Sequence, residues 1–121
     1  MLYEGYFGNF ENYPENEIFI VVSRYYPRFI RKGLSFHPEL APSKELLEDW
    51  KTGGISWELY EKRYRKEMKS EKAQETIKAL ARAIQYDDFR LLCYEKNPPC
   101  HRFILKELVF GVNSHDKQNN L

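Results

Sequence analysis

The chain has 121 residues, of which 42% are hydrophobic and 16% aromatic, so it is long enough and apolar enough to fold around one core. Its 19 basic and 18 acidic side chains nearly cancel, which excludes a strong overall field that attracts nucleic acid or an anionic membrane. Two cysteines are too few for a disulfide framework, and no basic segment followed by an apolar one begins the chain, so we expect a soluble, cytoplasmic protein.

Two segments near the start of the chain are predicted strands. Met1 to Phe7 is rich in aromatic residues, and Ile18 to Val22 is a continuous apolar run within Glu17 to Arg24. A continuous run, unlike an alternating one, is typical of a strand buried on both faces of a parallel sheet, so we expect helices on both faces. The run is far shorter than the roughly 20 residues of a membrane-spanning helix, and we expect no membrane partner.

The segment from Arg24 to Pro42 shows neither helical nor strand periodicity. It holds three prolines and one glycine among aromatic and basic residues, which predicts a long ordered loop or a set of short turns. A connection of this length in a small domain is usually functional or disordered, and its aromatic content argues against disorder. We therefore expect this loop to contribute to function.

Three helices are predicted after this loop. Each begins at a residue suited to N-capping, and these residues are Ser43, Ser56 and Ser70. The first helix covers Lys44 to Lys51 and ends at Gly53-Gly54, and the third runs through Tyr86. The second carries apolar side chains at helical spacing, which are Trp57, Tyr60, Tyr64 and Met68. Such a stripe is typical of core packing, so we interpret it as core rather than as a platform for stacking bases.

The last third of the chain predicts a strand, a turn and a final helix. Phe89 to Tyr94 carries β-forming residues, Asn97 to Pro99 cannot continue either element, and Phe103 to Phe110 regains helical spacing. The order of elements predicts an α/β fold with a mostly parallel sheet of about three or more strands, covered by helices. We expect a single small domain over residues 1–112 and a flexible C-terminal tail over residues 113–121.

The polar residues Cys100, His101 and Arg102 come at the start of the final predicted helix. Unpaired backbone N–H groups and the positive end of the helix dipole favour an anion or a thiolate there. We interpret Cys100 as a candidate nucleophile and His101 as a candidate general acid or base. The alternatives are a packed cysteine and a histidine bonded to a backbone carbonyl. Whether the protein is an enzyme therefore stays open.

A second basic cluster follows the strand that ends at Val22. Ligands of parallel sheets bind outside the carboxyl ends of the strands, where this cluster and the final helix would meet if their strands are neighbours. We therefore predict a pocket for a phosphate-bearing or carboxylate ligand, nucleotides included. Its predicted ligand-binding residues are Arg24, Arg28, Arg102 and Tyr26. The alternative is that an arginine of this cluster pairs with an acidic residue such as Glu39 or Glu95 and fixes the loop.

Two other chemistries fit the spacing poorly. A zinc site from Cys93, Cys100, His101 and His37 would have six residues between its cysteines, whereas structural zinc sites have about two to four. The phosphatase nucleophile loop needs a shorter separation than the eight residues between Cys93 and Arg102. A glycine-rich phosphate loop is also missing from the sequence. We therefore predict no metal and no cofactor.

Four segments together form a recognisable pattern. They are Arg24-x-x-Pro27-Arg28, Leu40-Ala41-Pro42-Ser43-x-Glu45-Leu46, Trp57-Glu58-x-Tyr60-x-x-Arg63-Tyr64-Arg65-x-Glu67, and Leu91-Leu92-Cys93-Tyr94-Glu95 leading to Cys100-His101-Arg102. The pattern resembles the DUF488 family of small prokaryotic proteins over most of residues 2–110. The resemblance implies an α/β fold with a parallel sheet and one pocket shared by both clusters. Members of that family carry an aspartate shortly before the first arginine, where this chain has Val22 and Ser23, so the resemblance favours anion binding over a reaction that needs this aspartate.

Two further functions stay open. The first is binding of single-stranded nucleic acid by basic residues interleaved with aromatic ones, which are Arg24, Arg28, Arg31 and Lys32 with Tyr25, Tyr26 and Phe29. The balanced net charge counts against this function. The second is a protein-interaction module whose exposed aromatic side chains contact a partner or a second copy.

Overall fold

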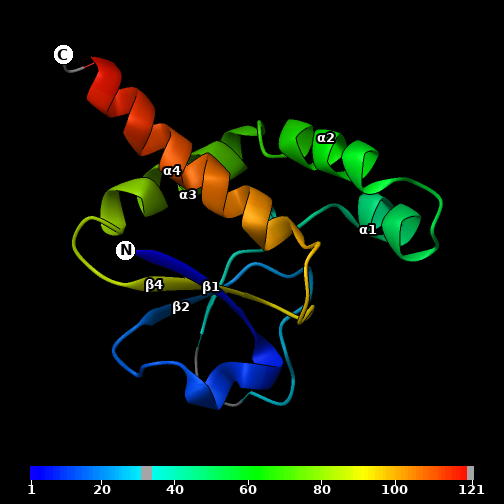
Figure 1. Ribbon diagram of the computed structural model, residues 1–121, viewed down its shortest axis with the longest axis horizontal. Coiled ribbons are helices and arrows are strands. Elements are labelled where there is room, and N and C mark those ends of the chain that lie inside the picture. The colour runs from blue at the N-terminus through cyan, green and yellow to red at the C-terminus, as the bar shows by residue number, and fades with distance from the viewer. Residues whose placement is uncertain (31–33, 120–121) are drawn as a thin grey trace.

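The computed structural model describes residues 1–30 and 34–119, and within them a four-stranded parallel sheet has the order β1-β4-β2-β3. The strands are β1 (Leu2–Tyr6), β2 (Ile18–Val21), β3 (Ser35–Phe36) and β4 (Phe89–Cys93). The helices are η1 (Phe7–Asn12), η2 (Pro38–Leu40), α1 (Lys44–Lys51), α2 (Trp57–Glu67), α3 (Glu71–Ala83) and α4 (His101–Asn119), where η marks a 3-10 helix. The α/β fold is therefore as predicted, and Figure 1 shows the α-helices gathered on one side of the sheet.

The three predicted N-caps form. The Ser43 side chain accepts a hydrogen bond from the N–H of Leu46 at 3.1 Å, and equivalent bonds begin α2 and α3. The bounds of α1 are those predicted, because a serine cap and a glycine stop are local signals. Helix α3 ends at Ala83, earlier than predicted, and α4 begins at His101, earlier than Phe103.

The two faces of the sheet are covered differently. Strand residues such as Leu2, Ile20 and Leu91 join the main core, which is shared with the α-helices and includes the predicted residues Tyr60, Tyr64 and Met68. The opposite face carries a smaller cluster of buried residues, which are Phe7, Val21 and Leu92. Among the described residues this second face is covered by η1 and by loop segments, drawn below the sheet in Figure 1. This finding corrects the expectation of helices on both faces, because the connections that leave β1 and β2 are too irregular to form α-helices there.

The strands β1, β4 and β2 end at the same edge of the sheet. Cys93 is in register with Tyr6 of β1, and Leu92 is in register with Val21 of β2. The chain leaves β4 at this edge and enters α4, so the start of α4 lies beside the carboxyl end of β2. The short strand β3 lies inside the segment predicted as a loop, since two residues are too few to show periodicity.

Helix α4 continues past the predicted domain boundary at residue 112. Its residue Asn113 donates a hydrogen bond to the carbonyl of Ala81 at 3.0 Å, which ties this turn of α4 to α3. The boundary itself stays a prediction.

Although α4 is the longest helix in residues 1–30 and 34–119, no helix in those ranges is apolar over a length that could cross a membrane.

Candidate functional site

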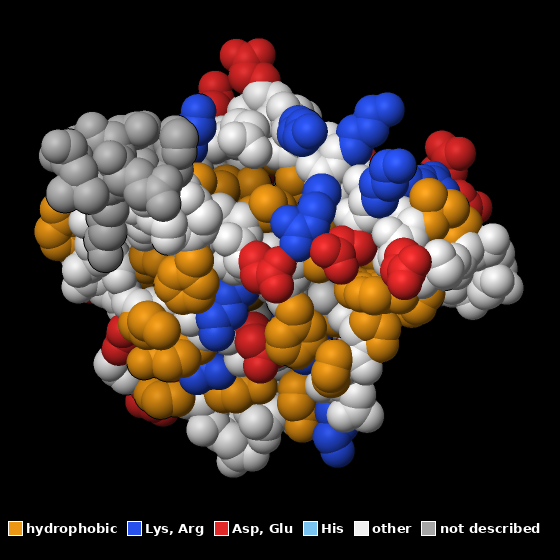
Figure 2. All heavy atoms as spheres, turned by 45° about the horizontal axis from the view of Figure 1, so that its top comes forward, with side chains coloured by type: hydrophobic (Ala, Val, Ile, Leu, Met, Phe, Trp, Pro, Cys, Tyr) orange, Lys and Arg blue, Asp and Glu red, His pale blue; other side chains and the backbone are white. Residues whose placement is uncertain are grey.

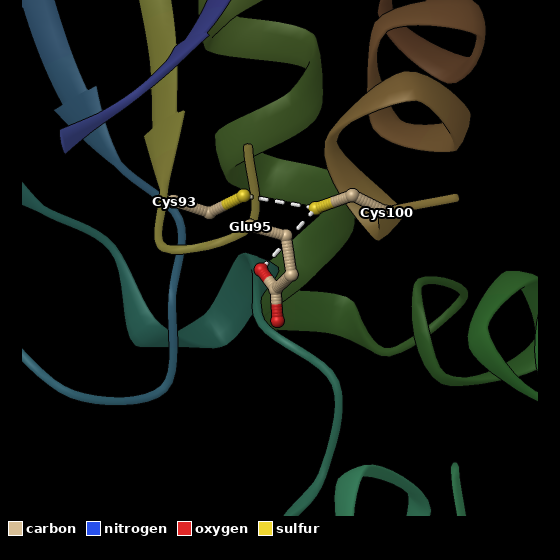
Figure 3. A group of neighbouring side chains, drawn as sticks. All are labelled: Cys93, Glu95 and Cys100. Carbon is tan, nitrogen blue, oxygen red and sulfur yellow. Dashed lines mark hydrogen bonds between the residues drawn. The ribbon is translucent and has the colours of Figure 1, made fainter. Parts of the chain in front are cut away.

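Two cysteine thiols meet at the carboxyl edge of the sheet. Cys93 is the last residue of β4 and Cys100 directly precedes α4, and Figure 3 shows their side chains extending toward each other across the gap between the two elements. Their Sγ atoms lie 2.8 Å apart, and both are free thiols that are 0% and 3% exposed. The spacing of six residues closes into a contact because Pro98 and Pro99 cannot continue β4, and the chain turns back.

Cys100 is placed to exist as a thiolate. A hydrogen bond joins Cys93 Sγ to Cys100 Sγ, and His101 Nδ1 lies 3.7 Å from Cys100 Sγ. These contacts lower the pKa of Cys100 to about 5, although burial alone would raise it. The bond to Cys100 raises the pKa of Cys93, which keeps its proton. Arg102 and Glu95 also act on Cys93, while burial and the charges of the two cysteines raise the pKa values of Tyr60 and Tyr64.

His101 is held between the thiol and the backbone. Its Nε2 lies 2.7 Å from the carbonyl oxygen of Val22, which can only accept, so Nε2 carries a proton and donates it. Nδ1 is thereby left facing Cys100 Sγ. The imidazole is 5% exposed, and its ring centroid lies 5.5 Å from that of Tyr64. The ring therefore makes the backbone contact of a structural histidine and also presents a nitrogen to Cys100.

Arg102 lies inside the protein, with 1% of its surface exposed. Its Nε donates to the carboxylate of Glu4 at 2.5 Å, and Nη1 donates to Cys93 Sγ at 3.0 Å. Further bonds reach the backbone carbonyls of Glu95 and Lys96 at 2.5 and 3.2 Å. The guanidinium thus ties β1, the end of β4 and the following loop together. Arg102 faces the protein interior at this edge, and its contact with Cys93 gives it a positioning role.

Arg24 and Arg28 lie near the same edge but in different surroundings. Arg24 follows β2, and its Nε and Nη2 donate to the carbonyl of Pro42 at 3.0 and 2.9 Å, just before α1. Arg28 lies close enough to Tyr94 for its charge to act on the phenol, and Tyr94 packs against Phe7 on the second face of the sheet. The structure therefore brings Arg24 beside the elements of the main core and leaves Arg28 on the other side of the edge.

Tyr26 is packed within the loop between β2 and β3. Its hydroxyl accepts a hydrogen bond from the N–H of Leu34 at 3.0 Å, and its ring packs edge-on against Phe36. Arg31 and Lys32, which belong to the nucleic-acid hypothesis, lie outside the described residues. On the face in Figure 2, lysine and arginine side chains alternate with aspartate and glutamate and do not form one basic stripe. This face therefore offers no single-sign field to a nucleic acid.

Cys93, Glu95 and Cys100 form a group with metal-ligating chemistry. Their ligand atoms all lie within 4.8 Å of one another, and thiolates and carboxylates are ligands of zinc. The Arg102 guanidinium, 3.0 Å from Cys93 Sγ, places a positive charge beside the group and opposes a second cation there. The prediction that no metal binds stays a prediction.

A cleft of about 800 Å³ lies on the second face of the sheet, between η1 and the chain near Ile30. Its lining combines aromatic rings such as Phe10 and Phe29 with the acidic residues Glu11 and Glu15. None of the residues predicted to act in catalysis or to bind the ligand lines this cleft. Its acidic lining would also repel a phosphate or carboxylate, so the cleft does not correspond to the predicted anion pocket.

Two residues of the site were not predicted from sequence. Glu4 pairs with Arg102 across 98 positions of the chain, and the Val22 carbonyl binds His101 across 79 positions. Only the pairing of β4 with both β1 and β2 brings these residues together. Local patterns carry no sign of such contacts, and the strand order would have been the one usable signal.

The sequence profile of the DUF488-N3a family, described as the active DUF488-N3 subclade, matches residues 9–110. The match includes both cysteines, His101 and Arg102. No curated protein and no solved structure matches the chain. The resemblance drawn from the four sequence segments is thereby confirmed.

Proposed function

This chain belongs to the DUF488 family, and on that premise we propose that it is a thiol enzyme. Cys100 is the nucleophile, and His101 is its acid or base. The substrate is a small molecule that carries a phosphate or carboxylate group, a class that includes nucleotides. Arg24 binds this anionic group, and Arg102 positions the thiols. The description of the matching subclade as active supports an enzyme over a passive binding protein.

The observation that carries this proposal is the chain of contacts from Cys100 through His101 to Val22. The distances are 3.7 Å from Cys100 Sγ to His101 Nδ1 and 2.7 Å from His101 Nε2 to the Val22 carbonyl oxygen. Nucleophilic thiols are activated by an adjacent base that a third group orients. The imidazole supplies the base here, and the backbone carbonyl orients it.

The charges at this edge support a substrate with two separate parts. A thiolate at Cys100 repels an anion, so a phosphate or carboxylate binds more favourably at Arg24 than beside the sulfur. Arg24 lies two residues after Val22, and the Pro42 carbonyl fixes the orientation of its guanidinium. An anionic group held at Arg24 leaves an uncharged, electrophilic part of the same molecule free to reach Cys100. Nucleotides, which separate phosphate from base by a sugar, fit this description.

The proposed chemistry needs both cysteines in the reduced state. The cytoplasm keeps protein thiols reduced, which agrees with the location expected from the sequence. In that compartment Cys100 would be available as a thiolate at neutral pH, because its pKa lies at about 5.

Protection of Cys100 from alkylation tests the proposal. The reduced protein is treated with iodoacetamide at pH 7, with and without inorganic phosphate or a nucleoside monophosphate, and the modified cysteine is identified by peptide mass. We expect Cys100 to react before Cys93 and both ligands to slow the reaction. Arg24→Gln should weaken protection by phosphate about tenfold, because it removes a charge-assisted hydrogen bond of about 1.5 kcal/mol.

Arg82→Gln is the matched control, since Arg82 is an exposed arginine on α3. This variant should retain the protection of the wild-type protein. Equal protection in the Arg24 and Arg82 variants would contradict the role of Arg24. Reaction of Cys93 in preference to Cys100 would contradict the assignment of the nucleophile.

A further inference from the structure

The contact between Cys93 and Cys100 has a use beyond lowering the pKa of one thiol. The two Sγ atoms are 2.8 Å apart, and a disulfide bond is about 2.05 Å long, so an approach of about 0.8 Å would join them. Cys93 is fixed at the end of β4, while Cys100 sits where the loop of residues 94–99 enters α4. Within that loop, Lys96 to Pro99 are exposed.

The surroundings of the two sulfurs are unequal, and this sets an order of events. Cys100 is the sulfur that carries the negative charge, because His101 Nδ1 lies 3.7 Å from it and its pKa is lowered, whereas the pKa of Cys93 is raised. A thiolate reacts with oxidants far faster than a thiol does, so Cys100 reacts first. Cys100 has 3% of its surface exposed, which favours a small oxidant over a bulky one such as a protein disulfide.

We propose that Cys100 is a site of reversible oxidation by small hydroperoxides and that Cys93 is its resolving thiol. The proposal rests on the proposed function only in using the same Cys100 thiolate. In the first step Cys100 Sγ attacks the terminal oxygen of the hydroperoxide. A sulfur–oxygen bond forms, the oxygen–oxygen bond breaks, and the departing alkoxide takes a proton from water. The products are a sulfenic acid on Cys100 and an alcohol, or water when the oxidant is hydrogen peroxide.

In the second step Cys93 Sγ attacks the sulfenic sulfur of Cys100. The sulfur–sulfur bond forms, the sulfur–oxygen bond breaks, and the hydroxyl group leaves as water with the proton that Cys93 gives up. The two thiols have then lost two electrons, which reside in the alcohol and in water. A dithiol reductant restores both thiols by exchange.

Arg102 prepares Cys93 for this second step. While Cys100 is an anion, its hydrogen bond and its charge raise the pKa of Cys93, whereas the Arg102 charge lowers it. Conversion of Cys100 into a neutral sulfenic acid removes that negative charge. The guanidinium, 3.0 Å from Cys93 Sγ, then stabilises the Cys93 thiolate that attacks. Arg102, which holds the loop in place, therefore also favours disulfide formation. Once the disulfide forms, Cys100 can no longer act as the proposed nucleophile.

The test uses the reduced, metal-free protein of 121 residues and one equivalent of hydrogen peroxide. We expect both thiols to be lost together, the protein mass to fall by two hydrogen atoms, and a peptide pair linked through Cys93 and Cys100. Dithiothreitol should restore both thiols. Cys93→Ser should stop at a sulfenic acid on Cys100 that dimedone traps, and Cys100→Ser should leave Cys93 unreacted under the same conditions.

Two outcomes would overturn the inference. One is a wild-type protein that gains oxygen on Cys100 without forming the Cys93 to Cys100 link. The other is a pair that stays reduced at this concentration of peroxide. Either outcome can occur while phosphate still protects Cys100 from alkylation, so failure of the redox pair is distinct from failure of the proposed function.

Discussion

Two arginine clusters contact the same strand residue, Glu4, and use it differently. Arg90 on β4 gives Nε and Nη2 to the two carboxylate oxygens of Glu17, at 2.6 and 2.8 Å, and Nη1 to the backbone carbonyl of Glu4 at 2.7 Å. Its guanidinium also lies 4.0 Å from the centre of the Tyr13 ring. The Arg90 cluster is therefore a bidentate ion pair that joins β4 to the chain before β2.

Arg102 binds the carboxylate of Glu4 and divides its remaining N–H groups between two loop carbonyls and the Cys93 thiol. One partner in this cluster is reactive, whereas the described partners of Arg90 are a carboxylate, a carbonyl and aromatic rings. An arginine of the first kind fixes the position of a reactive sulfur as well as stabilising the fold. The proposed function belongs to the carboxyl edge of the sheet, whereas Arg90 stabilises the fold.

The Arg90→Met substitution should have the largest effect on stability. It leaves the Glu17 carboxylate, whose side chain is 4% exposed, without its partner, which should cost about 3 to 5 kcal/mol in the free energy of unfolding. Urea denaturation measures this loss. In the folded variant, the rate of peroxide-driven disulfide formation should equal that of the wild type. Arg90→Lys takes its place if the methionine variant does not fold. Slower disulfide formation in either variant would show that Arg90 also acts on the thiols, which would contradict its purely structural role.

The Arg102→Met substitution should destabilise the protein less than Arg90→Met does, but it should slow disulfide formation. Glu4 keeps 29% of its side chain exposed and stays partly hydrated, so we expect a loss of about 2 to 3 kcal/mol from the unmade hydrogen bonds. Disulfide formation should slow several-fold, because Cys93 loses the adjacent cation. Stopped-flow fluorescence or quenched thiol counting follows the reaction. If the variant formed the disulfide at the wild-type rate, Arg102 would have no role in disulfide formation.

The Tyr64→Phe substitution separates packing at the site from chemistry. The Tyr64 hydroxyl donates to the carbonyl of Leu40 at 2.7 Å in the core, and its removal should cost about 1 to 2 kcal/mol. The ring remains against His101, so the alkylation rate of Cys100 should not change. Tyr86→Phe is the control, because Tyr86 is 84% exposed and its loss should leave stability unaltered. A change in the alkylation rate of Cys100 on loss of the hydroxyl would show that Tyr64 also contributes to the reactivity of this thiol.

The pH dependence of stability should distinguish the wild type from Cys100→Ser. The pKa of Cys100 falls from an ordinary value of 9.0 to about 5 on folding, so the folded state binds fewer protons than the unfolded chain between these values. The contribution of Cys100 is therefore complete above pH 9, declines as the pH falls, and is lost once the pH passes below about 5. Urea denaturation under reducing conditions from pH 9 to pH 5 should show a steeper loss in the wild type. Equal slopes in the two proteins would show that Cys100 titrates normally.

Local signals account for the parts of the fold that were predicted well. Helix α1 has the predicted bounds because Ser43 and Gly53 mark its ends chemically. The apolar composition of β2 and β4 was enough to identify both strands. The strand β3 and the helix η2 were missed within the loop that follows β2, since elements of two or three residues show no period.

The position of the candidate site in the fold was predicted in part for the same reason. Cys100, His101 and Arg102 were correctly located at the start of a helix, where local sequence determines the structure. The contacts that decide their roles involve Glu4, Val22 and Cys93, which are distant in the chain or return through a loop. The number of residues between the cysteines does not reveal that the loop brings the two sulfurs together.

In the proposed mechanism Cys100 is a thiolate at neutral pH, held in that state by Cys93 and His101. The most direct test is a titration of the ultraviolet absorbance of the thiolate in the reduced protein, which needs no reagent to reach a sulfur that is 3% exposed. We expect one thiol to titrate with a midpoint near 5, the midpoint to rise in Cys93→Ala, and the transition to vanish in Cys100→Ser. Titration of both thiols together near 9 would contradict the account.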